Sequence, residues 1–159
     1  MGDRDLEARD YSGNPLLNWP EEAGRIRTAC YTLILAIARY LPMKLKNPVL
    51  RSLGTEIGEN TAIGLEVQLD IFYPEKITIG SETTIGYGTT ILTHETTQEE
   101  FRTGEVEIGD NVLIGANTTV LPGVSIGDDA TVSAHSLVNR DVEEGEKAGG
   151  IPVENLEEG

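Results

Sequence analysis

Residues 107–141 read EIGDNVLIGANTTVLPGVSIGDDATVSAHSLVNRD, and within them an aliphatic residue returns at every sixth position. A period of six fits neither an α-helix nor a long alternating strand, so the repeating unit is a short strand followed by a corner. Three such units close a three-sided coil, and stacked coils form a hexapeptide β-helix. The aliphatic anchors are Ile108, Ile114, Val120, Ile126, Val132 and Val138.

The residues around each anchor predict how the unit folds. The position four after an anchor is small or β-branched, and it precedes the next anchor by two, so both side chains should point inward. These inward partners are Val112, Thr118, Val124, Ala130 and Ser136. Gly109, Gly115 and Gly127 follow their anchors directly, and we expect them to take corner backbone angles that a Cβ would resist.

The pattern covers residues 55–142, with two interruptions. Residues 70–76 should bulge from the first coil. Seventeen residues separate Ile91 from Ile108, which is not a multiple of six, so we expect residues 93–106 to leave the coil as an extruded loop. Loops on a rigid scaffold are where chemistry tends to concentrate.

Residues 1–54 precede the coil as an arm and a helical cap, and residues 143–159 follow it as a tail. Residues 23–55 carry six basic side chains and no acid, whereas residues 56–159 carry 21 acids and four bases. Two compatible interpretations follow: the helices cover the open end of the coil, or one helix face meets an anionic membrane or lipid-linked substrate. The same basic segment has apolar residues at three- or four-residue spacing, which predicts a helix: Ile26, Cys30, Leu33, Ile37 and Leu41.

Composition narrows the function classes. The net charge of −15 argues against a nucleic-acid partner, and a salt-rich cytosol that screens self-repulsion would account for it. Cys30 is the single cysteine, which excludes an intrachain disulfide and a thiolate-ligated metal cluster. The start, MGDRDLEARD, has no secretory h-region. We expect a cytoplasmic protein, at the inner face of the membrane if the basic segment makes contact.

The two histidines differ in position. His94 stands at the root of the extruded loop, where a rigid coil fixes its backbone and neutral imidazole could accept a proton near pH 7. The alternative is a solvated loop histidine. His135 lies inside a regular coil, at a corner that should face outward. A zinc site usually takes three protein ligands, so two histidines predict no metal centre.

Together the Ile-Gly hexads, the segment ITIGSETTIGYGTTILTHE (77–95), the block at 106–142 and the closing GGIPVENL (149–156) resemble the left-handed β-helix acyltransferases, in particular the galactoside and maltose O-acetyltransferase branch. The resemblance implies an all-β solenoid, a homotrimer with an active site in each cleft between neighbouring coils, and acetyl-CoA as cosubstrate. The acceptor would be a hydroxyl of a sugar or of a surface or lipid-linked glycan.

The resemblance also implies roles for individual residues. His94 matches the catalytic histidine, and the backbone N–H of Ala116 matches the donor to the oxyanion. The corner at Ala134 resembles the backbone that holds the pantetheine arm, which brings His135 beside the cofactor.

Departures from the family pattern concern the acceptor and the cofactor. Leu113 stands where relatives often have an aromatic in the acceptor pocket. Relatives commonly place a basic residue after the Gly-x-Pro tail, and here Arg140 and Lys147 are the only nearby cations for the phosphates of acetyl-CoA. Asp70 and Gln68, beside the bulge, are candidates to orient the acceptor hydroxyl. The alternative function is a non-catalytic trimeric scaffold that kept the coil and lost the cofactor site.

Overall fold

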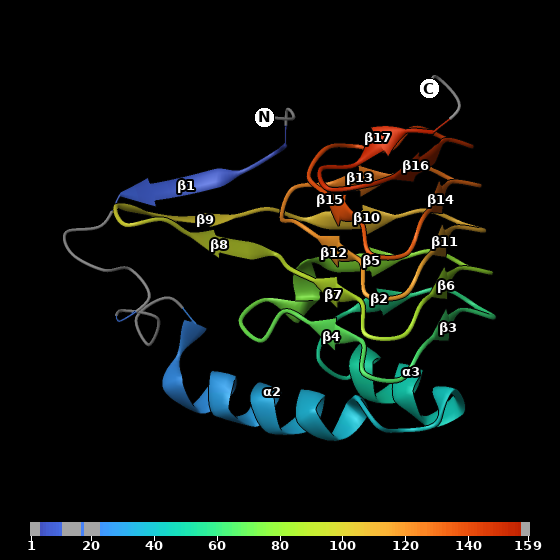
Figure 1. Ribbon diagram of the computed structural model, residues 1–159. Coiled ribbons are helices and arrows are strands. Elements are labelled where there is room, and N and C mark those ends of the chain that lie inside the picture. Colours follow the sequence, from blue (N-terminus) through green and yellow to red (C-terminus); the bar gives the residue numbers. More distant parts are fainter. Residues whose placement is uncertain (1–3, 11–16, 18–22, 157–159) are drawn as a thin grey trace.

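The computed structural model describes residues 4–10, 17 and 23–156, and most of them form a three-sided coil (Figure 1). Its walls are three parallel sheets, and consecutive strands of the chain fall in different sheets. The β2 sheet contains β2 (Glu56–Ile57), β5 (Ile77–Ile79), β10 (Val106–Ile108) and β13 (Ser125–Ile126). The β3 sheet contains β3 (Ala62–Ile63), β6 (Thr84–Ile85), β11 (Leu113–Ile114), β14 (Thr131–Val132) and β16 (Lys147–Gly149), with β17 (Glu154–Asn155) antiparallel at its edge. The β4 sheet contains β4 (Gln68–Leu69), β7 (Thr90–Ile91), β12 (Thr119–Val120) and β15 (Leu137–Val138).

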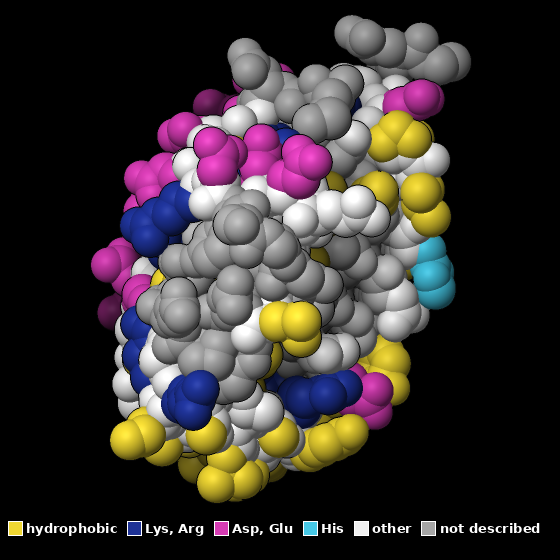
Figure 2. Space-filling model, turned by 90° about the vertical axis from the view of Figure 1, so that its left-hand side faces the viewer, with side chains coloured by type: hydrophobic (Ala, Val, Ile, Leu, Met, Phe, Trp, Pro, Cys, Tyr) yellow, Lys and Arg dark blue, Asp and Glu magenta, His cyan; other side chains and the backbone are white. Residues whose placement is uncertain are grey.

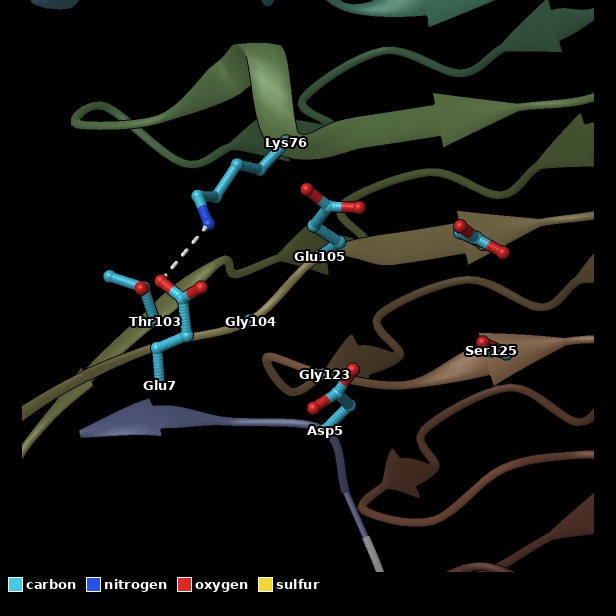
Figure 3. A pocket seen from close by; sticks show the side chains of 9 residues that line it. Asp5, Glu7, Lys76, Thr103, Gly104, Glu105, Gly123 and Ser125 are labelled. Atoms are coloured by element: carbon cyan, nitrogen blue, oxygen red, sulfur yellow. Dashed lines mark ion pairs between the residues drawn. The ribbon is translucent and has the colours of Figure 1, made fainter.

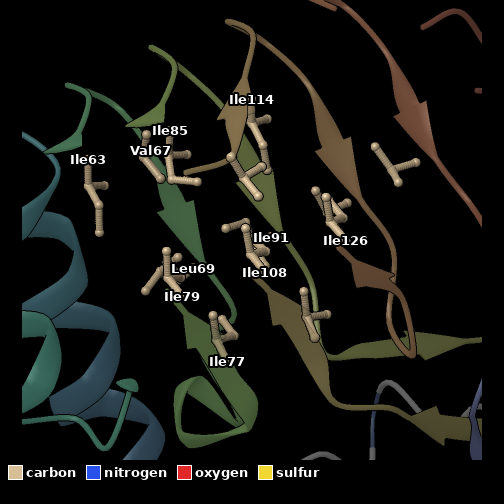
Figure 4. Close-up of a cluster of buried hydrophobic side chains, with 14 of the residues drawn as sticks. Ile63, Val67, Leu69, Ile77, Ile79, Ile85, Ile91, Ile108, Ile114 and Ile126 are labelled. Carbon is tan, nitrogen blue, oxygen red and sulfur yellow. The ribbon is translucent and has the colours of Figure 1, made fainter. Parts of the chain in front are cut away.

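The anchors of the six-residue repeat meet across coils in register. In the β3 sheet, Ile63 pairs with Ile85, Ile85 with Ile114 and Ile114 with Val132. The anchors fill the interior of the coil in stacked layers (Figure 4). The predicted inward partners are buried as well, from Val124 and Ala130 at 0% exposed to Ser136 at 3%. Each fully buried Ile or Val stabilises the coil by about 1.5–3 kcal/mol.

The glycines after the anchors are needed for a different reason from the one that we predicted. They have no left-handed backbone angles; those fall two residues later, on residues such as Asn111, Asn117 and Asp129, with φ between 55 and 60°. Asn and Asp tolerate this region better than most side chains do. Only glycine fits at the positions of these glycines, because the next turn of the coil lies directly against them. A Cβ on Gly127 would come 2.6 Å from the backbone nitrogen of Glu144.

Two helices cap the end of the coil where β2, β3 and β4 begin (Figure 1). They are α2 (Arg25–Ala38) and α3 (Met43–Arg51). Leu35, Ala38, Leu50 and Leu53 join the core of the coil. The ammonium group of Lys46 is buried and donates to the carbonyl oxygens of Gly64 and Arg39, and burial lowers its pKa. Residues 21–22, where the acidic side chains before α2 lie in the sequence, and most of the arm lie outside the described residues.

Both interruptions of the repeat form structure of their own. The bulge ends in the short helix η2 (Pro74–Lys76). Residues 93–106 contain the hairpin β8 (His94–Thr96) and β9 (Glu100–Thr103), which projects from the coil. Strand β1 (Glu7–Asp10), from the N-terminal arm, pairs antiparallel with β9. At the other end, Val142 bridges to Ile126 and β16 pairs with β14, so the coil continues beyond residue 142, where we expected a tail.

Candidate active site

The two interruptions of the repeat meet at a buried carboxylate, Asp70, which is 2% exposed. Its Oδ1 accepts hydrogen bonds from the backbone N–H groups of Phe72 and Tyr73, at 2.8 and 3.2 Å. Its Oδ2 accepts from the N–H groups of Thr93 and His94, at 2.9 and 3.1 Å, and lies 2.5 Å from Nδ1 of His94. The bulge and the root of the hairpin are therefore joined through one side chain.

The charge on Asp70 determines the tautomer of His94. Burial by itself would raise the pKa of Asp70, but the hydrogen bond and charge of His94, with the N–H groups of Thr93 and Phe72, hold that pKa below its usual value. An ionised carboxylate can only accept, so Nδ1 of His94 carries the proton that it donates to Oδ2. The lone pair of a neutral imidazole is then on Nε2, where it can accept a proton from another molecule.

Two aromatic rings fix the plane of the His94 imidazole. The Phe72 ring lies 4.5 Å from it between centroids, and the Phe101 ring lies parallel to it at 5.6 Å. Both phenylalanines are buried, and they come from the bulge and from β9. We did not predict this packing. A signal was present, because these are the only two phenylalanines of the chain and each lies in a segment that breaks the repeat.

The N-terminal arm holds the hairpin that carries His94. The guanidinium of Arg4, with a side chain only 6% exposed, binds both carboxylate oxygens of Glu95, at 2.9 and 3.2 Å, and donates to the carbonyl oxygen of Pro122 in the coil. Burial raises the pKa of Glu95, and the hydrogen bonds and charges of Arg4 and Arg102 lower it below its usual value. The backbone beside His94 is thereby tied to both the arm and the coil.

The predicted cofactor residues Ala116 and Ala134 stack at the corner between the β3 and β4 sheets. Each follows an anchor of the β3 sheet by two residues, and the N–H of His135 donates to the carbonyl oxygen of Ala116 at 2.9 Å. His135 is exposed and has a left-handed φ of 58°. Among the described residues, nothing accepts a hydrogen bond from the N–H groups of Ala116 and Ala134. These two donors are available to a ligand.

The other residues predicted to bind the acceptor or the cofactor do not lie together in one chain. Gln68 is exposed on the β4 sheet and lines a hollow of about 230 Å³ against α2, while Leu113 is 47% exposed on the β3 sheet. The guanidinium of Arg140 binds both oxygens of the buried Glu146 carboxylate, at 2.6 and 3.2 Å, which raises the pKa of Arg140. Lys147 is exposed on β16. Within the described parts of the chain, no three potential ligands gather as a metal site.

A hollow of about 420 Å³ lies between the N-terminal arm, the root of the hairpin and the β2 sheet (Figure 3). Lys76 pairs there with Glu7 at 4.0 Å, and three further carboxylates line the space: Asp5, Glu105 and Glu107. The excess of negative charge repels phosphate groups. This hollow is therefore unsuited to an anionic cofactor.

Comparisons with known proteins agree with the coil and with the hexapeptide repeat. A model of the bacterial transferase hexapeptide family (six repeats) matches residues 105–140. YvoF of Bacillus subtilis, a candidate acetyltransferase, is 51% identical over 123 residues, covering 76% of this chain and 72% of YvoF. The chain belongs to the hexapeptide-repeat acetyltransferase family. This confirms the predicted left-handed β-helix acyltransferase family, and it makes the protein an acyltransferase.

Solved structures of other hexapeptide-repeat acetyltransferases have the same fold. VCA0836 of Vibrio cholerae is 26% identical, with a TM-score of 0.70 over 82% of this chain and 89% of that one. A second VCA0836 structure, a complex with acetyl coenzyme A, is 27% identical with a TM-score of 0.69, covering 82% of this chain and 85% of that one. A galactoside acetyltransferase in complex with coenzyme A is 18% identical, with a TM-score of 0.59 over 82% of this chain and 80% of that one, and shares the fold.

Proposed function

We propose that this hexapeptide-repeat acetyltransferase moves the acetyl group of acetyl-CoA to a hydroxyl of a sugar or glycan, with His94 as the general base. The Asp70–His94 pair is the observation that carries the proposal. A carboxylate that binds Nδ1 and leaves Nε2 as the acceptor is the arrangement that general-base catalysis requires. A merely solvated loop histidine would have neither the buried carboxylate partner nor the two packed phenylalanine rings.

The reaction then needs no metal ion. Nε2 of His94 takes the proton of the acceptor hydroxyl while the hydroxyl oxygen forms a bond to the thioester carbonyl carbon. The carbonyl becomes an oxyanion. When it collapses, the carbon–sulfur bond breaks, and the leaving thiolate of coenzyme A takes the proton from the imidazolium. The products are an acetyl ester and coenzyme A, and His94 is neutral again.

Asp70 is a positioning residue in this proposal, and we no longer assign it to the acceptor hydroxyl. Its oxygens are already occupied by four backbone N–H groups and by Nδ1 of His94. It holds the imidazole in the reactive tautomer and stabilises the imidazolium that forms during transfer. The available N–H of Ala116 is our candidate for the oxyanion donor.

A single chain cannot bring these groups to one thioester. Ala116 precedes Thr119 of β12 by three residues, and His94 follows Thr90 of β7 by four, while Thr90 and Thr119 are paired in parallel strands. At the rise of a β-strand, this offset of three plus four residues separates the two backbones by roughly 20 Å. Completing the site requires a neighbouring copy, which supports a homotrimer with one site in each cleft between coils.

The same cleft would hold the cofactor. The N–H of Ala134, with His135 beside it, is placed to meet the pantetheine arm. Arg140 already neutralises Glu146, so a cation from a neighbouring copy would be needed beside Arg140 and Lys147 to hold the phosphates. Leu113 and Gln68 remain candidates for acceptor contacts, and an exposed aliphatic Leu113 favours an acceptor with an apolar face.

Incubation with acetyl-CoA and a panel of glycans tests the proposal. Free thiol should appear only with an acceptor present, and mass spectrometry should find an added acetyl ester on that acceptor. Cys30 is a free and exposed thiol, which would add to the signal of a thiol reagent, so the assay uses the Cys30→Ser variant. A complete absence of thiol release at every salt concentration would instead favour the non-catalytic scaffold.

A further inference from the structure

The outer face of α2, the side of the helix turned away from the coil, is apolar along its whole length. Thr28, Leu35 and Ala38 form the opposite, buried side. On the outer face Ile26 is 84% exposed, Leu33 63% and Ile37 55%. At 100° per residue these side chains lie in one stripe opposite the buried side, together with Ala29, Cys30 and Ala36. A stripe of this length without a charge is unusual for a surface in contact with water only.

Helix α3, at the same end of the coil, carries exposed apolar side chains as well. Met43 and Leu45 are 55% and 59% exposed. Lys44, between them, is exposed and has no partner within the described residues, and Arg25 stands likewise at the start of α2. Figure 2 shows hydrophobic side chains gathered at the helical end, with Lys and Arg side chains beside them. We call the outer faces of α2 and α3, with Arg25 and Lys44, the cap surface.

The charge of the cap surface opposes that of the rest of the protein. Residues 23–55 hold six basic side chains and no acid in a chain of net charge −15. Within that segment Arg27 pairs with Glu75, and Lys46 is buried. The exposed cations Arg25 and Lys44 therefore flank an apolar stripe. An apolar face bordered by Lys and Arg is the pattern of helices that lie in the interface of an anionic membrane.

A second copy of the chain fits this surface less well. A symmetric contact between two cap surfaces would bring Arg25 and Lys44 of each copy together, with no acid in residues 23–55 to compensate. A contact between one cap surface and the acidic coil of another copy would pair the cations but would leave the apolar stripe against charged side chains. Neither arrangement satisfies both the apolar stripe and its cations, whereas an anionic bilayer does.

We propose that the cap surface docks on a membrane containing anionic lipid, with α2 lying in the plane of the interface. Helix α2 has 14 residues, about 21 Å, and no helix among the described residues is long and apolar enough to cross a bilayer. In the proposed trimer, the coils stand side by side about a common axis, so all three cap surfaces face the same way. The trimer rests on the proposed function. Within it, three weak membrane contacts act together and give one stronger attachment.

Sedimentation with vesicles tests the proposal. The full chain should sediment with phosphatidylcholine vesicles that contain phosphatidylglycerol, bind vesicles without it far more weakly, and be released by salt. Arg25→Gln with Lys44→Gln should lower the partition coefficient about 25-fold, since each cation at such a surface contributes about fivefold. Lys76→Gln, which removes the charge of a lysine outside the cap surface, is the matched control and should leave the partition unchanged.

Apolar variants and a probe complete the test. Leu33→Ser should weaken binding, whereas Leu156→Ser, 53% exposed and outside the cap, should not. Cys30 lies in the stripe, so the emission of an environment-sensitive fluorophore on it should shift to the blue on anionic vesicles, while that of a label at Glu144→Cys in a Cys30→Ser background should not.

No binding to either kind of vesicle, or equal binding by all variants, overturns the proposal. Growth in particle size that Leu33→Ser abolishes would assign the surface to a second copy. Thiol release from acetyl-CoA without vesicles is measured in parallel, so failure of docking and failure of the transferase proposal are separate results.

Discussion

Replacement of Asp70 by asparagine separates the positioning role from a role in acceptor binding. Asparagine has the same shape but no charge, and one of its two terminal atoms is a donor. If the amide nitrogen takes the place of Oδ1, two backbone N–H groups, those of Phe72 and Tyr73, lose their acceptor. If it takes the place of Oδ2, three donors lose theirs, including Nδ1 of His94. The first orientation is therefore preferred.

The contacts of Asp70 allow the loss of stability and the loss of turnover in this variant to be estimated. Two buried N–H groups without an acceptor cost about 1–3 kcal/mol each, so the free energy of unfolding should fall by about 2–6 kcal/mol. Turnover should fall more severely, by about 10²- to 10⁴-fold, because the imidazolium that forms in the transition state loses its counter-charge. Circular dichroism establishes the temperature at which the variant is folded, and thiol release is measured there.

The double variant gives a readout that a structural role alone would not change. Asp70 and His94 act as a unit, so a variant with both Asp70→Asn and His94→Asn should be no slower than His94→Asn alone. An Asp70→Asn variant with a raised KM for the acceptor, an unchanged kcat and an effect that adds to that of His94→Asn would refute this reasoning and return Asp70 to the acceptor site.

Four further results are expected. His94→Asn, which keeps a donor for Asp70 but removes the base, should cut turnover at least about 100-fold with little change in melting temperature; an unchanged rate would remove the catalytic assignment. Gly127→Ala should destabilise the coil by about 3 kcal/mol or more, because its Cβ meets backbone of the next turn, whereas Gly145→Ala has open space and should cost only about 1–2 kcal/mol of left-handed strain, as thermal unfolding would measure. Because the pKa of Asp70 is held below its ordinary 3.8, its contribution to stability is present above that pH and lost below it, so acid titration of the unfolding free energy should be shallower in Asp70→Asn. Light scattering should give the mass of three chains, and a monomer would contradict the shared cleft.

The six-residue repeat was sufficient to predict the coil. An aliphatic anchor such as Ile114 can point inward at every sixth position only if the chain turns a corner between anchors, so the periodicity determines the register in which Ile114 and Val132, three hexads apart, stack. The two broken intervals likewise predicted which segments leave the coil. The roles of glycines such as Gly127 were mistaken, because close contact between successive turns is a property of the stacked coils and leaves no local signal in one hexad.

The site needed contacts that no spacing encodes. The sequence determined that His94 stands at the root of a projecting segment, that the core is built from stacked aliphatic anchors, and that the helical segment is basic. Only the tertiary structure decided that Asp70, 24 residues earlier, binds Nδ1 of that histidine, and that the apolar stripe of α2 faces away from the core. The physical reason is that periodicity reports which side chains share a face, whereas the pairing of two irregular segments and the side on which a helix packs depend on how the whole coil closes.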